Sequence, residues 1–232
     1  QPYMLNQGSN GSCNAEATVG AFHNRRLLDG LKHVPLSSKH LYMNINGGRD
    51  SGSMLDDGLR YAATKGISPK ELKVDGKPVV FPHNVFSKRQ ISSQLLREAD
   101  IAATSFLSHE AYRLPVDSFA VFKIALASAL AQDHQVIHAW MAGSNATNLR
   151  NGYVQQARGM GNHATLFHSG KWVGGEDLVH PDCQNSWGPS ANVLYGPVNQ
   201  GVWDGGFGLF TMESAYQCAK FHTFWVLPGN KM

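Results

Sequence analysis

The chain has 232 residues, of which 42% are hydrophobic and 16% charged, a composition typical of a globular protein and not of a disordered one. Its formal net charge of +3 is too small to indicate a nucleic-acid partner. No apolar run approaches the roughly 18 residues that a membrane span needs. We therefore expect a single domain, residues 1–232, with no nucleic-acid partner and no membrane span.

Helical patterns dominate the first half of the chain. The apolar spacing predicts a first helix from about Cys13 to Leu28, with Gly30 as its stop. Three prolines predict an irregular connection over residues 67–86. Further helices are expected as a short helix from Ser37 or Ser38 to Tyr42, from near Ser53 to Gly66, from a capping box at Ser87–Gln90 through Glu98, and from Phe119 to Leu130.

Short strands follow in the second half. They are predicted at Val136–Met141, Ala164–His168, Lys171–Val173, Phe207–Thr211 and Phe221–Leu227. Helices followed by strands indicate an α+β fold with segregated elements. We expect a helical lobe over roughly residues 7–118, a strand-rich lobe over roughly 119–232, and a cleft between them.

Cys13 lies where a glycine-rich loop meets the start of the first predicted helix. A helix N-terminus offers partial positive charge and unpaired N–H groups, and both stabilise a thiolate. Gln7, six residues upstream, carries an amide that is suited to donate a hydrogen bond to an oxyanion. The segment from Gln7 to Cys13 therefore predicts a nucleophilic cysteine.

Two motifs downstream complete the pattern, Asn162-His163-Ala164 and Asn185-Ser186-Trp187-Gly188. With the segment around Cys13 they resemble the papain family of cysteine peptidases, as a bacterial or viral type of member. The resemblance extends to Leu36–Leu41, Asp50–Leu55 and Trp203–Phe207. It implies a papain-like two-lobe fold with the active site in the cleft.

The chemistry of thiol peptidases gives each residue of the pattern a role. Cys13 is the candidate nucleophile and His163 the candidate general base and acid. Asn185 would orient the imidazole of His163, and Gln7 would line the oxyanion hole with the backbone amide of Cys13. Trp187 would shield the bond between His163 and Asn185 from water.

The resemblance also implies the residues that hold the substrate. An apolar side chain is expected in the pocket for the residue that precedes the scissile one, because the matching positions are apolar or small. Gly52 is equally well interpreted as a turn residue. The implied substrate-binding residues are Gly52, Ser53, Met54, Leu55, Ala139, Asn162, Ala164 and Trp187.

The chain departs from the family pattern near the nucleophile. Asn14 stands where the family usually has an aromatic residue, and Asn10 stands where it usually has a disulfide-bonded cysteine. Cys183 and Cys218 are left either as a disulfide or as two free thiols. No cofactor or metal is expected, because neither His134 with His138 nor His180 with Cys183 has a complete ligand set around it.

The compartment and partners are indicated only weakly. Asn10-Gly11-Ser12 is a glycosylation acceptor, and a glycan there would block the cleft, which favours a bacterial or viral origin over a eukaryotic secretory one. The chain begins with Gln1, so we expect processing, excision from a longer parent polypeptide or the choice of a shortened segment, any of which could have removed a targeting segment or a pro-segment. The expected partner is a protein or peptide substrate.

The predicted function is that of a cysteine endopeptidase working through a Cys13 acyl-enzyme. Two alternatives remain open. A cell-wall amidopeptidase or a transglutaminase-like enzyme also uses a cysteine followed by a histidine. A catalytically silent papain fold could instead serve as an assembly module in a large complex.

Overall fold

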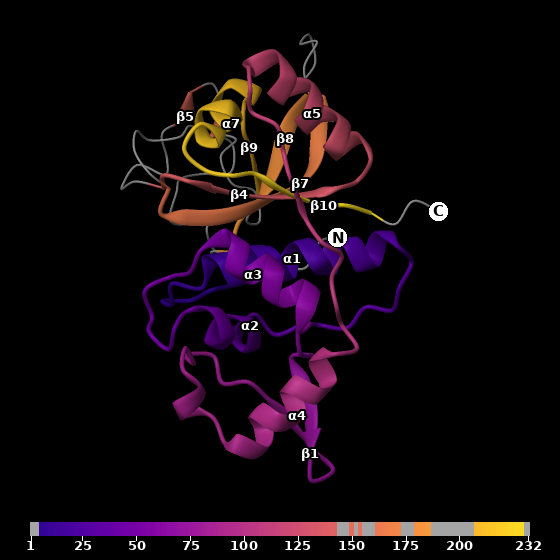
Figure 1. Cartoon of the computed structure of the whole chain (residues 1–232), viewed down its shortest axis with the longest axis vertical. Coiled ribbons are helices and arrows are strands. Elements are labelled where there is room, and N and C mark those ends of the chain that lie inside the picture. The colour runs from indigo at the N-terminus through magenta and orange to yellow at the C-terminus, as the bar shows by residue number, and fades with distance from the viewer. Residues whose placement is uncertain are drawn as a thin grey trace.

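The computed structural model describes residues 5–142, 149–150, 153–154, 161–172, 179–186 and 207–229. It shows an α+β protein in which α1 to α4 occupy one half of the molecule and the main sheet with α5 and α7 occupies the other (Figure 1). The predicted fold class is therefore confirmed. Trp187, Trp203 and most of the segment between Asn185 and Phe207 lie outside the described residues.

The first three predicted helices are present as α1 (Cys13–Leu28), α2 (Ser38–Ile45) and α3 (Leu55–Thr64). Helix α1 is buried on every side over most of its length, because it packs both on the other helices and on the sheet. At Gly20 the helix packs closely against the side chains of Leu5 and Leu166. A Cβ atom there would lie 2.7 Å from Cδ1 of Leu5 and 3.2 Å from Cδ2 of Leu166.

The prediction of an irregular connection over residues 67–86 is wrong. The segment contains a hairpin of β1 (Glu71–Val74) and β2 (Lys77–Val80). Asp75 and Gly76 form its turn with φ of 50° and 74°, the left-handed pair that two-residue hairpins favour. Pro78 is tolerated because a two-stranded sheet consists only of edge strands.

The capping box at Ser87 and Gln90 forms, but on a separate short 3-10 helix, η1 (Lys88–Gln90). Helix α4 (Ser93–Ala103) begins afresh with Ser92 as its N-cap, whose side chain accepts a hydrogen bond from the N–H of Leu95. The predicted continuous helix is therefore interrupted. Ser92 supplied a second N-cap that the sequence interpretation did not use.

The second half forms a six-stranded antiparallel sheet in the order β3-β10-β4-β7-β8-β9, with two helices packed on it. Strands β5 and β6 form a separate two-stranded sheet. The strands are β3 (Tyr112–Arg113), β4 (Gln135–Trp140), β5 (Leu149–Arg150), β6 (Tyr153–Val154), β7 (His163–Trp172), β8 (Val179–Gln184), β9 (Phe207–Leu209) and β10 (Trp225–Leu227), and the helices are α5 (Phe119–Ala131) and α7 (Met212–Ala219).

The strand predictions are confirmed in part. The two strands expected at 164–168 and 171–173 are one strand, β7, with a register shift between Phe167 and Ser169. Only the last three residues of the strand expected at 221–227 are extended. Strand β8 and helix α7 were not predicted, and β3 joins the sheet although it precedes residue 119.

The sheet has a hydrophobic core on each face. Val136 and Phe167 pack toward α5 and α7, whereas their neighbours Ile137 and Leu166 pack toward α1. Cys183 and Cys218 are both free and buried in the core beside α5 and α7, so the structure contains two thiols and no disulfide between them. A smaller third core lies between α4 and the hairpin.

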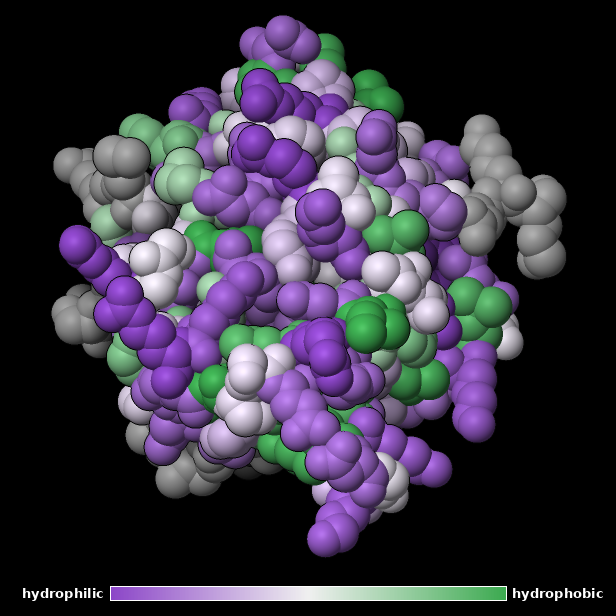
Figure 2. Space-filling view, turned by 60° about the horizontal axis from the view of Figure 1, so that its bottom comes forward, coloured by the Kyte–Doolittle hydropathy of each residue, from purple (hydrophilic) through white to green (hydrophobic). Residues whose placement is uncertain are grey.

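Within the described ranges, no helix is both long enough and apolar enough to cross a bilayer. The face that turns the α4 end toward the viewer carries mostly hydrophilic residues, with apolar residues in small groups between them (Figure 2). Such a face is ordinary for a protein in contact with water.

Candidate active site

The two halves of the molecule enclose a cleft of about 540 Å³. Gln7 and Cys13 line it from the helical half, and His163 lines it from the first residue of β7. Asn185 directly follows β8, the strand that pairs with β7. The structure therefore brings the four predicted catalytic residues to one place from three separate segments.

His163 has a fixed orientation. Its Nε2 lies 2.7 Å from Oδ1 of Asn185. The same Oδ1 accepts the backbone N–H of Ser186 at 2.7 Å, so this atom is the amide oxygen. Because an amide oxygen only accepts, Nε2 of His163 donates, and in the neutral ring Nδ1 is the basic nitrogen.

Burial has opposite effects on the two central groups. It lowers the pKa of His163 to about 4, although the hydrogen bond with Asn185 acts to raise it. It raises the pKa of the Cys13 thiol, although backbone hydrogen bonds at Ala164 and Asn14 act to lower it. Burial therefore favours a neutral thiol and a neutral imidazole, and the hydrogen bonds favour the charged forms.

Gln7 is tied to the segment that carries Asn185. Its backbone N–H donates to the carbonyl of Ser186 at 2.8 Å, and its Oε1 accepts the hydroxyl of Ser186 at 2.6 Å. Its Nε2 donates one hydrogen bond to the carbonyl of Asn10 at 3.0 Å. An amide nitrogen has two protons, so the side chain of Gln7 retains a second N–H for another acceptor.

The aromatic neighbour of His163 among the described residues is Trp140. It is fully buried, and its ring meets the imidazole edge-on with centroids 5.9 Å apart. The two residues are a cross-strand pair of β4 and β7. Trp187, which is predicted to shield this histidine, lies outside the described residues, and no sequence motif pointed to Trp140.

Seven of the eight predicted substrate-binding residues line the cleft. Ala139 and Ala164 are a cross-strand pair and so lie on the same face of the sheet. Gly52 has φ of +83°, a backbone conformation that favours glycine, and its interpretation as a turn residue stays a prediction. The seven residues are Gly52, Ser53, Met54, Leu55, Ala139, Asn162 and Ala164.

Asn14, the departure next to the nucleophile, supports this wall of the cleft. Its Nδ2 donates to Oγ of Ser53 at 3.0 Å and to the carbonyl of Met54 at 2.6 Å. Asn162 is likewise used as a brace, because its amide makes hydrogen bonds of 2.9 and 3.1 Å with the backbone of Ala142. Both asparagines hold backbone segments that border the cleft.

The opposite wall contains residues that sequence reasoning missed. His222 accepts the backbone N–H of Gly161 at its Nε2, and burial lowers its pKa. Trp225 donates its indole N–H to Oδ1 of Asp56 across the cleft at 3.1 Å. Arg113 lies over the ring of Trp225 at 5.1 Å and 4.0 Å from Oδ2 of Asp56.

These residues carry no motif that could have revealed them. The residues that line this wall are Phe221, His222, Thr223 and Trp225, and they follow a helix that was not predicted. Within the described ranges, no three His, Cys, Asp or Glu side chains gather as a metal site.

Solved structures with the same fold are cysteine proteases. The chain aligns over 96% of its length with 65% of digestive procathepsin L 3 from the larval midgut of Tenebrio molitor, with a TM-score of 0.67 and 17% identity. It aligns over 99% with 63% of the ragweed pollen allergen Amb a 11, a cysteine protease in its proform, with a TM-score of 0.64 and 18% identity. It aligns over 100% with 84% of xylellain, a cysteine protease from Xylella fastidiosa, with a TM-score of 0.65 and 18% identity.

The chain has the papain-like cysteine protease fold. It spans 65% and 63% of the first two of these proteins. No protein-family model and no curated protein matches its sequence. At 17–18% identity the similarity establishes the fold, and the activity has to be argued from the site.

Proposed function

We propose that the protein is a cysteine endopeptidase that hydrolyses peptide bonds through an acyl-enzyme on Cys13. The observation that carries the proposal is the 2.7 Å contact between Nε2 of His163 and Oδ1 of Asn185, in the cleft that Cys13 also lines. It supplies a base of defined tautomer near a thiol at a helix N-terminus. The papain-like fold supports the same reaction.

In the first step, Sγ of Cys13 attacks the carbonyl carbon of the scissile peptide. The thiol proton passes to Nδ1 of His163, and the carbonyl oxygen becomes an oxyanion. When the tetrahedral intermediate collapses, the C–N bond breaks, and His163 returns the proton to the leaving amine. A thioester on Cys13 remains.

In the second step, water attacks the thioester. His163 accepts a proton from this water, the C–S bond breaks, and the proton returns to the sulfur of Cys13. Asn185 keeps the ring in one tautomer through both steps. Because burial favours the neutral imidazole, His163 readily gives up the proton that it accepts.

Two donors are proposed for the oxyanion. One is the backbone N–H of Cys13 at the start of α1, and the other is the second N–H of the Gln7 amide. Because the bonds to Asn10 and Ser186 fix this amide, its remaining donor is oriented before the reaction begins.

The substrate is proposed to bind as an extended peptide along the wall formed by residues 52–55. The pocket between this wall and the pair of Ala139 and Ala164 is mainly apolar, which supports the preference for an apolar residue before the scissile one. A larger precursor is also proposed, and the two proforms among the similar structures support it.

The test is turnover of a fluorogenic peptide with an apolar residue before the scissile position. Cys13→Ala and His163→Ala should each abolish measurable turnover, and Cys218→Ala, which alters a buried thiol in the core beside α5 and α7, should retain it. Iodoacetamide should label Cys13 first, as mapped by mass spectrometry. A folded wild-type chain that cleaves no peptide would overturn the proposal and favour an assembly module.

A further inference from the structure

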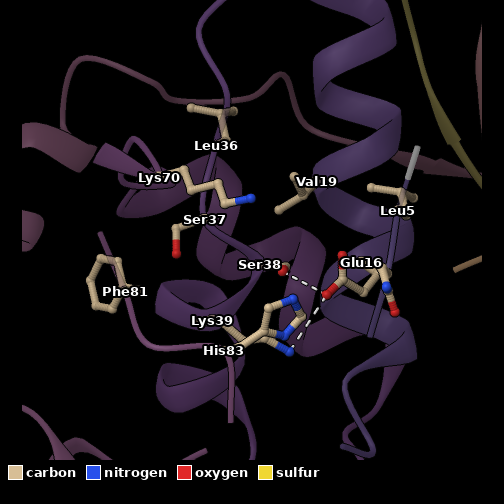
Figure 3. A pocket seen from close by; sticks show the side chains of 11 residues that line it. Leu5, Glu16, Val19, Leu36, Ser37, Ser38, Lys39, Lys70, Phe81 and His83 are labelled. Atoms are coloured by element: carbon tan, nitrogen blue, oxygen red, sulfur yellow. Dashed lines mark hydrogen bonds and ion pairs between the residues drawn. The ribbon is translucent and has the colours of Figure 1, made fainter. Parts of the chain in front are cut away.

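Two buried residues of opposite charge, Glu16 and Lys39, lie between α1 and α2. Glu16, one turn after Cys13, is only 4% exposed, and Lys39 in the first turn of α2 is 7% exposed. Figure 3 shows Glu16 turned toward Ser38 and Lys39 at the wall of a cavity of about 90 Å³. The hydroxyl of Ser38 donates to Oε1 of Glu16 at 2.7 Å.

The ammonium group of Lys39 points inward, where lysine side chains usually keep theirs in water. Its Nζ lies 3.8 Å from Oε1 of Glu16. Burying such a pair costs desolvation energy that the attraction of the two charges does not reliably offset. The pair is therefore poorly explained as a source of stability alone.

The other contacts of Lys39 lie on the loop before the nucleophile. Its Nζ donates to the carbonyl of Gln7 at 3.3 Å and to Oγ of Ser12 at 3.4 Å. Two of the three protons of the ammonium group are thus used by Gln7 and Ser12, whereas Glu16 lies at ion-pair distance, beyond the reach of a hydrogen bond. Lys39 thus holds the first and last residues of the loop 7–12 from one point.

This loop needs to be held. Gly8 has φ of +62°, and with Gly11 it leaves the backbone few steric restraints of its own. Asp50 holds the loop at Gly11, because its Oδ1 accepts the N–H of this residue at 2.8 Å. Lys39 and Asp50 therefore restrain different parts of the same loop.

The residues that Lys39 holds adjoin the proposed oxyanion donors. Gln7 carries one donor on its side chain, and Ser12 immediately precedes the backbone N–H of Cys13. Displacing such groups by about 1 Å typically costs roughly 100-fold in rate. The spacing of the two donors is thus set in part by the ends of the loop.

We propose that Lys39 is a positioning residue that fixes the oxyanion donors by holding the carbonyl of Gln7 and the hydroxyl of Ser12, with Glu16 as its buried counter-charge. This inference rests on the proposed function of the site. It requires that the loss of Lys39 lowers kcat while KM stays within about twofold, since the loop stabilises the transition state more than the bound substrate.

Two variants separate positioning from charge balance. Lys39→Met leaves Glu16 buried without its cation and is expected to lose stability as well as activity. The double variant Glu16→Gln with Lys39→Met removes both buried charges. The urea concentration at its unfolding midpoint should therefore lie near that of the wild type. If Lys39 positions the loop, the double variant should still lose about 10- to 100-fold in kcat. Lys73→Met, which removes the charge of an exposed lysine in β1, is the control and should behave as the wild type.

Hydrogen exchange of residues 7–12 gives a readout that does not depend on peptidase activity. Exchange should become faster in the double variant and remain unchanged in Lys73→Met. Unchanged exchange in the double variant, or faster exchange with an unchanged kcat, would overturn the role of Lys39. If the wild type cleaved no peptide, the proposed function would fail, and exchange would still decide whether Lys39 holds the loop.

Discussion

Gln7 connects two parts of the proposed site through one amide group. Its oxygen accepts from Ser186, next to Asn185, and its nitrogen donates to the loop that leads to Cys13. Removing the side chain of Gln7 therefore removes the proposed oxyanion donor. In the loop it removes only the hydrogen bond to the carbonyl of Asn10.

We predict that Gln7→Ala lowers kcat/KM by about 100- to 1,000-fold, because one oxyanion donor is lost. Alkylation of Cys13 by iodoacetamide forms no oxyanion and should keep its rate within a few fold. Ser186→Ala removes the partner of Oε1 but leaves the donor in place, so its loss should stay below about tenfold. An equal fall in alkylation and turnover of Gln7→Ala would contradict the assignment.

A buried histidine in α1 predicts how stability depends on pH. Burial, together with His33 and Arg26, lowers the pKa of His23 from 6.5 to about 4. Below pH 6.5 the unfolded chain binds a proton that the folded chain does not, so stability falls as the pH drops from about 6.5 to 4. Above this window His23 is neutral in both states and adds no dependence.

Urea unfolding at several pH values measures this effect. His23 alone contributes about 3 kcal/mol of acid destabilisation across the window, and His23→Gln should reduce the slope of stability against pH. The exposed His109 is surrounded by water in both states, so His109→Gln is the control. If the stability of His23→Gln fell with pH as steeply as that of the wild type, groups other than His23 would be responsible for the pH dependence.

The sequence predicted which residues gather at the site better than how they are supported. Cys13, His163 and Asn185 belong to short motifs whose order along the chain was informative. Trp140 and Trp225 belong to no motif, because their places depend on strand pairing and on a contact across the cleft. Lys39 was missed because a lysine that turns inward looks like any surface lysine in the sequence.

Gly66 and Gly76 both have a positive φ, but they differ in their surroundings. Gly66 ends α3 with φ of +81°, and a Cβ atom there would lie 1.9 Å from the carbonyl oxygen of Ala103 at the end of α4. Gly76 has φ of +74° in the hairpin turn, and a Cβ atom added there would meet none of the described residues within 4 Å. An alanine at position 66 would be strained and would also clash with the backbone of α4. An alanine at position 76 would only be strained.

We predict that Gly66→Ala destabilises the protein by at least about 3 kcal/mol, because α4 has to move away from α3. Gly76→Ala should cost only about 1 kcal/mol, the ordinary penalty of a left-handed alanine. Urea unfolding of both variants measures the difference. An equal loss of unfolding free energy in the two variants would show that α4 can move away from Gly66 at no cost, which would contradict the prediction.

Helices whose apolar repeat continues over several turns were predicted well, whereas short elements were not. Helices α1 and α5 have their expected limits within a residue, because their patterns extend over three or more turns. The hairpin at 71–80 was missed because its prolines outweighed the Asp75-Gly76 turn signal. Helix α7 and strand β8 are short and contain polar residues, so neither shows a clear period.

One hydrophobic core joins both lobes of the protein. The cluster around α1 contains Ala15 and Val19 from the helix and Ile137 and Leu166 from the sheet. Residues from the two lobes are therefore buried against one another, and neither lobe would keep this core covered alone. The lobes should unfold as one cooperative unit.

Leu166→Ala tests this cooperativity. We predict a loss of about 2–5 kcal/mol, because a fully buried leucine leaves a cavity between α1 and the sheet. All five tryptophans lie in the second half of the chain, so their fluorescence reports on that lobe, while circular dichroism also follows α1 to α4. Both signals should shift together in urea. Separate transitions would mean that the lobes unfold independently.

The hydrogen bond from Trp225 to Asp56 ties the two lobes together beside the cleft. It joins β10 to α3 at the margin of the groove, and Arg113 packs against both partners. A hinge motion that widened the aperture would have to break it first. If the protein is the proposed endopeptidase, this contact would limit how far the two lobes can separate to take in a peptide.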